Sequence, residues 1–145
     1  MELCIREGKE GWCCPAVFGV YGDCLYQPDW EKFCRVAQEL KEDDMVRLLR
    51  AERGGQVLGA CAVRQYPEGR AEILGIGTAP ESRRQGIGRQ MVTFLQRDER
   101  ITTLEAETDG EAVDFYCRCG FAAEAHQKRY PNGLVTRYRC TWERT

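Results

Sequence analysis

A glycine-rich loop between a strand and a helix most constrains how this chain can fold. The loop carries Gly86-Ile87-Gly88 and follows an apolar run that ends at Pro80. After it, apolar side chains recur at positions 87, 91, 94 and 95, the spacing of an amphipathic helix. Unsatisfied N–H groups at a helix start bind phosphate, and arginines at 83, 84 and 89 add positive charge. The sequence therefore predicts a phosphate-binding loop at this junction.

Two common nucleotide loops do not match this sequence. The mononucleotide loop requires Lys and then Ser or Thr after its last glycine, whereas Arg89-Gln90 follow here. The dinucleotide fingerprint requires a third glycine, which is missing. The loop alone leaves open the alternative that Gly88 only allows the helix to pack closely on the sheet.

The remaining periodicities predict one domain over residues 1–145 with an α/β fold. Apolar alternation and turn residues predict strands at 3–6, 45–52, 56–65, 70–78, 101–108, 121–130 and 134–142. Helices are expected at 30–41, with Asp29 as the cap, and from the loop to about 97. A third helix is expected after Thr108 or Asp109, and either of these two residues could cap it. Gly75 and Gly77 indicate a bulge or a close approach within their strand. Residues 8–27 show no clear period.

Composition excludes several classes of protein. The net charge is −2, from 21 basic and 23 acidic side chains, and no basic block favours nucleic acid. No apolar run is long enough for a membrane span, and the first residues do not resemble a signal peptide, so we expect a cytoplasmic protein. Nine cysteines are expected to be reduced and buried as small apolar residues. Their spacing does not suit zinc, so no metal is expected.

Residues 73–121 resemble the GNAT superfamily of N-acetyltransferases. The run from Arg83 to Gly88 fits its loop of Arg or Gln, two residues, Gly, one residue, and Gly or Ala. The strand that ends at Pro80 fits the segment expected upstream. Downstream, Ala112-Val113-Asp114-Phe115-Tyr116 and then Gly120-Phe121 fit the second motif. The resemblance covers about a third of the chain and implies a mixed, mostly antiparallel sheet of six to seven strands that splays at the cofactor site, with flanking helices.

The resemblance also implies acetyl-CoA as co-substrate and a set of residues that bind it. The pantetheine arm would pair with the strand backbone, and loop N–H groups would hold the pyrophosphate. Asp109 stands where many relatives have Asn. The implied cofactor-binding residues are Ile76, Gly77, Thr78, Arg83, Arg84, Gln85, Gly86, Ile87, Gly88, Arg89 and Asp109.

The implied reaction is direct attack of a primary amine on the thioester in a ternary complex. Tyr116 occupies the general-acid position, although a core aromatic on the helix stripe is the alternative. Glu72 is the candidate base, and a solvated strand residue paired with Arg70 or a neighbour is at least as compatible with its position. Glu105 and Glu107 are further candidates. A backbone N–H at the bulge would stabilise the oxyanion.

Other functions stay open at this point. The fold could instead serve as a catalytically weak acyl-CoA-binding module or sensor. The acceptor is a small-molecule or peptide amine, with no nucleic acid or membrane as partner, and the last strands could pair across a homodimer. His126 is expected on the strand after Phe121, as a surface or hydrogen-bonded residue.

Overall fold

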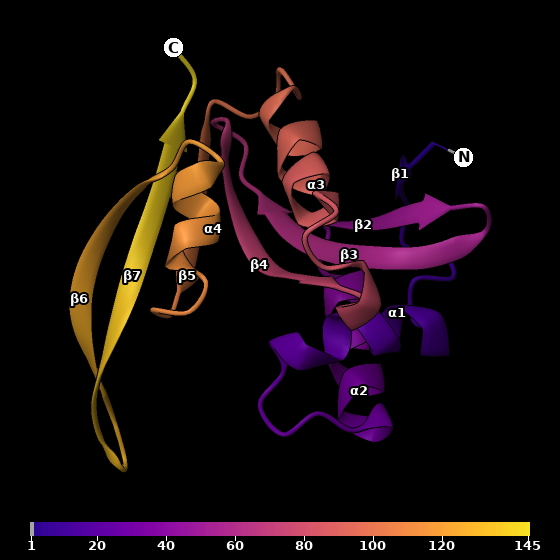
Figure 1. Cartoon of the computed structure of the whole chain (residues 1–145), viewed down its shortest axis with the longest axis horizontal. Helices are drawn as coiled ribbons and strands as arrows, with labels where there is room; N and C mark the ends of the chain where they lie inside the picture. Colours follow the sequence, from indigo (N-terminus) through magenta and orange to yellow (C-terminus); the bar gives the residue numbers. More distant parts are fainter. Residues whose placement is uncertain (1) are drawn as a thin grey trace.

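One seven-stranded sheet with four α-helices around it makes up the fold (Figure 1). The computed structural model describes residues 2–145. The strands are β1 (Cys4–Glu7), β2 (Val46–Arg53), β3 (Gln56–Gln65), β4 (Arg70–Thr78), β5 (Thr103–Thr108), β6 (Ala122–Tyr130) and β7 (Gly133–Glu143). The helices are α1 (Pro15–Tyr21), α2 (Trp30–Glu42), α3 (Ile87–Gln96) and α4 (Val113–Arg118), with the 3₁₀ turns η1 (Gly22–Cys24) and η2 (Pro80–Ser82).

The sheet is antiparallel except at its centre. Its order is β1-β2-β3-β4-β5-β7-β6, and among residues 2–145 only β4 and β5 pair in parallel. This pairing stops at Ile73 and Ala106, so the rest of β4 has no partner on its β5 side. The expected mixed, mostly antiparallel sheet with a splay is therefore confirmed, with seven strands.

Different helices cover the two faces of the sheet. In β2, Leu49 and Ala51 belong to a core that includes residues of α3 and α4, whereas Val46 and Leu48 pack with α1 and α2. Side chains alternate between faces along a strand, which produces this division. Figure 1 shows α3 lying over β3 and β4, with α4 beside it near β7.

A bulge in β4 lies where the splay begins. Ala62 of β3 pairs with Gly75 and Val63 pairs with Ile73, so Leu74 is an extra residue in β4. An extra residue bends a strand and redirects the groups that follow it. The bulge predicted from the strand glycines is confirmed, and its extra residue lies two positions before Ile76.

The N-terminal helices differ in how well the sequence predicts them. Helix α2 begins after Asp29, whose carboxylate accepts a hydrogen bond from the Lys32 N–H at 2.8 Å, as predicted. Helix α1 lies inside the segment that showed no period, because seven residues are too few to establish one. No helix among residues 2–145 combines the length and apolar character that crossing a bilayer requires.

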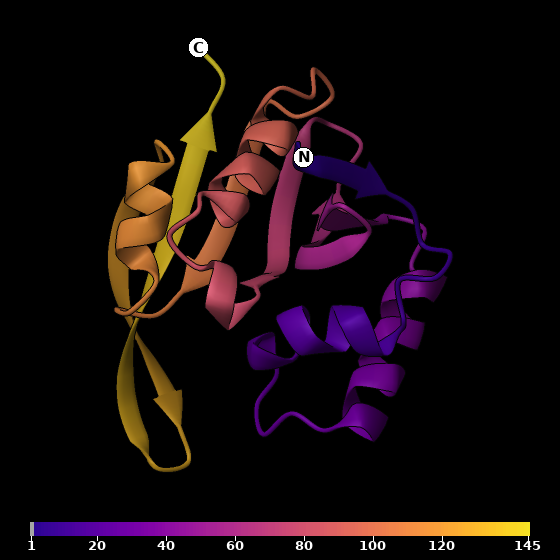
Figure 2. The ribbon, with the colours of Figure 1, turned by 45° about the vertical axis from the view of Figure 1, so that its right-hand side comes forward.

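The β6–β7 hairpin is the most exposed part of the sheet. Figure 2 shows it extending past the other strands, away from the end where the C-terminus lies. Leu134 and Val135, next to its turn, are 60% and 42% exposed. Strand β6 forms the sheet edge, which is where a second copy would pair, so the homodimer stays a prediction.

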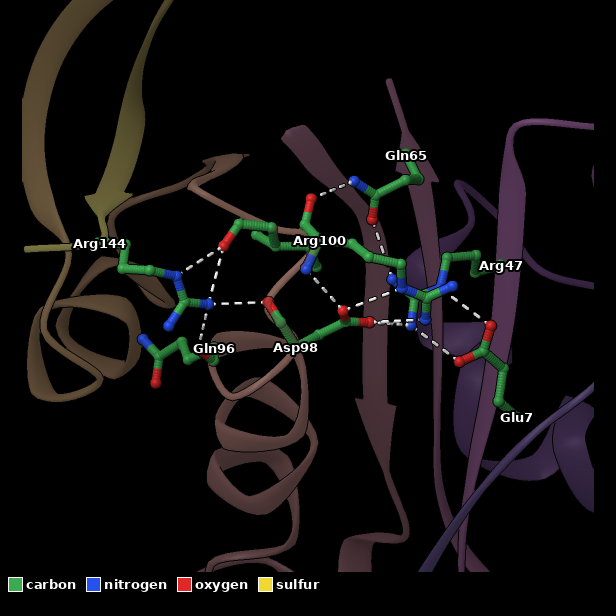
Figure 3. A network of polar contacts seen from close by, with 8 residues as sticks. Glu7, Arg47, Gln65, Gln96, Asp98, Arg100 and Arg144 are labelled. Atoms are coloured by element: carbon green, nitrogen blue, oxygen red, sulfur yellow. Dashed lines mark hydrogen bonds and ion pairs between the residues drawn. The ribbon is translucent and has the colours of Figure 1, made fainter. Parts of the chain in front are cut away.

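A polar network holds the end of α3 against β2 and the C-terminal segment (Figure 3). The Arg47 guanidinium lies 2.8 Å from carboxylate oxygens of both Glu7 and Asp98. Arg144 donates hydrogen bonds of 2.7–2.8 Å to the carbonyls of Gln96, Asp98 and Ile101. Hydrogen bonds from Arg100, and then from Arg47, hold the pKa of Asp98 well below its usual range. The network fixes the segment that leads from α3 into β5.

The cysteines are free thiols, but most of them are not buried. Cys61, on central strand β3, and Cys140, on β7 beneath α4, are the two buried ones. Cys4, Cys13, Cys24 and Cys117 are exposed, and Cys14, Cys34 and Cys119 are intermediate. The expectation that the cysteines serve as small core residues is therefore wrong for most of them, because they stand on the edge strand, loops and helix surfaces.

Candidate active site

The glycine-rich loop leads into α3 with its first N–H groups free. Gly86 is the N-cap with a φ of 78°, and no side chain caps the helix. The N–H groups of Ile87, Gly88 and Arg89 have no intrahelical acceptor, because the first turn of a helix lacks one. The first turn contains no acidic residue that would oppose an anion. The loop therefore presents backbone donors at the positive end of a helix dipole.

A cavity of about 700 Å³ opens in front of these donors. Its wall combines the loop with the end of β4 and one side of α4. Most of the predicted cofactor-binding residues line it, but Ile76, Gly77, Gln85 and Asp109 do not. The lining residues are Thr78, Ser82, Arg83, Arg84, Gly86, Ile87, Gly88, Arg89, Phe115, Arg118 and Cys119.

The α4 side of this cavity was not predicted from the sequence. A Cβ on Gly88 would stand 3.2 Å from two ring carbons of Phe115, so the first turn of α3 and α4 are in close contact. Arg118 adds a further guanidinium to the wall. The sequence signal for Arg118 is its spacing from Phe115. Residues three apart on a helix lie on the same face, so Arg118 and Phe115 face the cavity together.

The unpaired edge of β4 carries a backbone donor beside a thiol. The Ile76 N–H lies near the sulfur of Cys24, on the turn that follows α1, and acts to lower the pKa of that thiol. Cys24 is exposed as a residue, but its sulfur faces β4. Burial there raises the pKa of the thiol to about 11, although the Ile76 N–H opposes that rise. No sequence pattern indicates Cys24 as a site residue, because it lies in the segment 8–27, which has no clear period.

Tyr116 lies in the core next to the splay. It is 5% exposed, and its ring makes edge contacts with Phe115 and Phe121 at centroid distances of 5.1 and 5.3 Å. Burial raises the pKa of the phenol above its usual value. Among residues 2–145 its hydroxyl has no hydrogen-bond partner. The phenol is therefore neutral at physiological pH and free to donate.

The three candidate carboxylates lie on the sheet face opposite α3 and α4. Glu105 lies 2.8 Å from Arg70 and 3.8 Å from Arg139. Glu107 lies 3.8 Å from each of the cations Lys128 and Arg137, and 3.4 Å from the His126 ring nitrogen Nε2. Glu72 is half-buried and makes no ion pair with any residue from 2 to 145. The alternative that Glu72 pairs with Arg70 is therefore wrong, since Arg70 binds Glu105.

Asp109 holds the turn that leads into α4. Its Oδ1 atom accepts hydrogen bonds of 3.0 Å from the N–H groups of Glu111 and Ala112. The helix itself begins at Val113 with Ala112 as its N-cap and without a side-chain cap, so the expectation that Thr108 or Asp109 caps it is wrong. His126 lies on β6, as predicted. No group of three or more metal-ligating side chains occurs in the described part of the chain.

A family model described as the acetyltransferase (GNAT) family matches residues 12–121. The chain belongs to this family. The matched range includes the glycine-rich loop, the splayed part of β4 and α4. Comparison with curated protein sequences returned no significant match.

Solved structures of GNAT acetyltransferases share this fold over almost the whole chain. A ribosomal-protein-alanine N-acetyltransferase from Brucella melitensis is 20% identical, with a TM-score of 0.73 over 97% of this chain and 99% of that one. The ribosomal-protein-S18-alanine N-acetyltransferase from Escherichia coli is 18% identical, with a TM-score of 0.74 over 98% and 94%. A variant of the spermidine N-acetyltransferase SpeG from Vibrio cholerae is 16% identical, with a TM-score of 0.69 over 97% and 93%.

Proposed function

We propose that this GNAT protein is an N-acetyltransferase that transfers the acetyl group of acetyl-CoA to a primary amine. The observation that carries this proposal is that three features occur together in this part of the fold. Free N–H groups at the start of α3 face the cavity, the edge of β4 beyond Ile73 is unpaired, and the Tyr116 phenol lies next to that edge. Pyrophosphate, pantetheine and thioester require these features in this order.

The cavity suits a phosphorylated ligand because of its donors and its charge. The N–H groups of Ile87, Gly88 and Arg89 would hold the pyrophosphate, and the guanidinium groups of Arg84 and Arg118 would neutralise it. The unpaired backbone of β4 from Ile76 to Thr78 would bind the pantetheine amides as a neighbouring strand would.

The reaction forms a C–N bond and breaks the C–S bond of the thioester. The Ile76 N–H, at the bulge, would stabilise the oxyanion that develops on the carbonyl. The Cys24 sulfur is a weak hydrogen-bond acceptor, so little free energy is lost when the Ile76 N–H turns from it to the oxyanion. Tyr116 would give its proton to the departing thiolate, and the attacking amine would lose a proton to a base.

Glu72 is the best candidate for that base. It is the unpaired carboxylate of the three, whereas cations occupy Glu105 and Glu107. At about 3.3 Å per residue, four positions along β4 separate Glu72 from Ile76 by roughly 13 Å. The proton would therefore pass through water.

The acceptor is a primary amine on a small molecule or a peptide. The structurally similar enzymes act on unlike amines, an alanine of a ribosomal protein in one case and spermidine in another. The second candidate function is a sensor that binds acyl-CoA without turnover. The free, neutral Tyr116 hydroxyl favours the enzyme, because a binding module does not require a proton donor there.

Thiol release from acetyl-CoA in the presence of a panel of amines tests the proposal. The panel comprises spermidine, peptides with N-terminal alanine or internal lysine, amino acids and alkylamines. We expect release with at least one amine, and Tyr116→Phe should bind CoA normally but lose turnover. CoA binding without transfer to any amine would favour the sensor instead.

A further inference from the structure

A second phenol lies against β4, at the end of α1. Tyr21 is 3% exposed, and among residues 2–145 its hydroxyl has no hydrogen-bond partner. A Cβ on Gly75 would stand 2.4 Å from the Tyr21 oxygen, so the hydroxyl fills the place of a side chain at Gly75. The Tyr21 hydroxyl is thus held one residue away from Ile76 and its N–H.

The two phenols approach β4 from opposite faces of the sheet. Tyr116 belongs to the core cluster with α3 and α4, and Tyr21 belongs to the cluster with α1 and α2. They lie close enough for the Tyr116 phenol to contribute to the raised pKa of Tyr21, after burial and two cysteines. The phosphate-binding cavity lies on the Tyr116 side, because Phe115 and Arg118 of α4 line it. Tyr21 therefore lies on the side left for the amine.

Packing explains the Tyr21 ring but not its hydroxyl. The ring makes an edge contact with Trp12 at 5.0 Å and a tilted contact with Phe33 at 6.5 Å, which a phenylalanine would reproduce. A buried hydroxyl without a partner opposes folding. The fully enclosed side-chain N and O atoms without a partner among residues 2–145 are Arg53 Nε, His126 Nε2 and Arg137 Nε. The Tyr21 oxygen is not one of them, so a small part of its surface is accessible. A partner from outside the chain can therefore meet it.

We infer that the Tyr21 hydroxyl binds the acceptor amine and directs its lone pair at the thioester carbonyl. This inference rests on the proposed function. The phenol oxygen accepts a hydrogen bond from the amine N–H, and burial keeps the phenol neutral, so Tyr21 neither gains nor loses a proton in the reaction. The amine proton leaves for the base, and Tyr116 protonates the thiolate on the other face. Tyr21 lies nearer to the Ile76 N–H than Glu72 does, which suits direct contact with the nucleophile.

The substitution Tyr21→Phe tests this assignment, with Tyr130→Phe on the distant hairpin as the matched control. The assay measures kcat and KM for acetyl-CoA and for the best amine of the panel, together with the melting temperature. We expect kcat/KM for the amine to fall about 10-fold or more in Tyr21→Phe, the effect of one lost hydrogen bond to a reacting group. The KM for acetyl-CoA and the melting temperature should not change, and Tyr130→Phe should behave as the wild type.

Other results overturn the inference in distinguishable ways. If Tyr21→Phe retains kcat/KM within twofold, Tyr21 only packs, and the proposed function stands. A parallel loss of melting temperature and of affinity for acetyl-CoA would also assign Tyr21 a purely structural role. If the wild type transfers acetyl to no amine while it binds CoA, the proposed function fails and this inference fails with it.

Discussion

Gly88 and Phe115 meet in the wall of the cavity at the start of α3, where a Cβ on Gly88 would stand 3.2 Å from the Phe115 ring. That distance is shorter than an ordinary contact between carbon atoms. The first turn of α3, which carries the free N–H groups, is therefore positioned directly against α4. The cavity keeps its shape only while this contact is made by a residue without a side chain.

Replacing Gly88 by Val should weaken CoA binding at least 10-fold. Branched methyl groups would displace the Phe115 ring into the cavity and shield the α3 amides. Isothermal titration with CoA measures the effect. Gly19→Ala is the control, because a Cβ at that position meets nothing within 4 Å and should leave the affinity unchanged. Equal affinity of Gly88→Val and the wild type would contradict a role for this wall in binding.

Arg84 combines a charge proposed to bind the cofactor phosphates with an unfavourable backbone conformation. Its φ is 73°, in the left-handed region that costs a non-glycine residue about 1 kcal/mol. Arg84→Gly and Arg84→Gln both remove the guanidinium, so both should weaken CoA binding. Arg84→Gly alone relieves the backbone and should be more stable than Arg84→Gln by up to about 1 kcal/mol in urea denaturation. The same stability in both variants would show that the loop is not strained.

Acetyl-CoA should protect Cys24 from alkylation. The sulfur faces the Ile76 N–H, which the thioester oxygen would occupy in the proposed complex. Because the thiol pKa is raised to about 11, the alkylation rate should increase with pH up to that value. Mass spectrometry of peptides labelled with iodoacetamide follows this site.

Cys4, exposed on β1, is the internal control for the same experiment. Its labelling should not respond to acetyl-CoA, because β1 lies at the far edge of the sheet from the splay. If saturating acetyl-CoA leaves the labelling of Cys24 unchanged, the thioester does not bind beside this thiol, and the prediction is wrong.

Asp98→Asn should destabilise the protein by about 2 kcal/mol at pH 7, the scale of a lost charged hydrogen-bond network. The folded-state pKa of Asp98 is lowered, chiefly by hydrogen bonds from Arg100 and then from Arg47. Its stabilising effect is therefore complete above the unfolded pKa of about 3.9, and it is lost as the pH falls toward the folded value. Wild type and Asp98→Asn should converge in acid.

Urea denaturation at pH 7 and at about pH 2.5 measures this convergence. Glu99→Gln is the control, because the neighbouring Glu99 makes no ion pair within residues 2–145. A constant difference between wild type and Asp98→Asn at both pH values would mean that the carboxylate charge does not stabilise the network.

Local patterns were enough to predict much of the sheet and the glycine-rich loop that leads into α3. The cap at Asp29, the bulge beside Gly75 and the helix after Gly86 each depend on residues close in sequence, and all three are present. Helix α1 was missed because it is short, and its residues are selected by contacts with β3 and β4 rather than by a period of their own. The cysteines were misjudged because exposure depends on the strand or loop that carries each one.

The sequence by itself determined the order of the elements, the glycine-rich helix start and the family, since each of these is encoded in a contiguous stretch. Only the tertiary structure decided which groups meet at the splay. Tyr21, Gly75 and Cys24 come together because α1 and its turn pack on β4 across a long separation in sequence. The pairing of Arg70 with Glu105 likewise leaves Glu72 free, through the parallel register of β4 and β5. Such contacts follow from how the sheet and helices pack, and no local pattern specifies them.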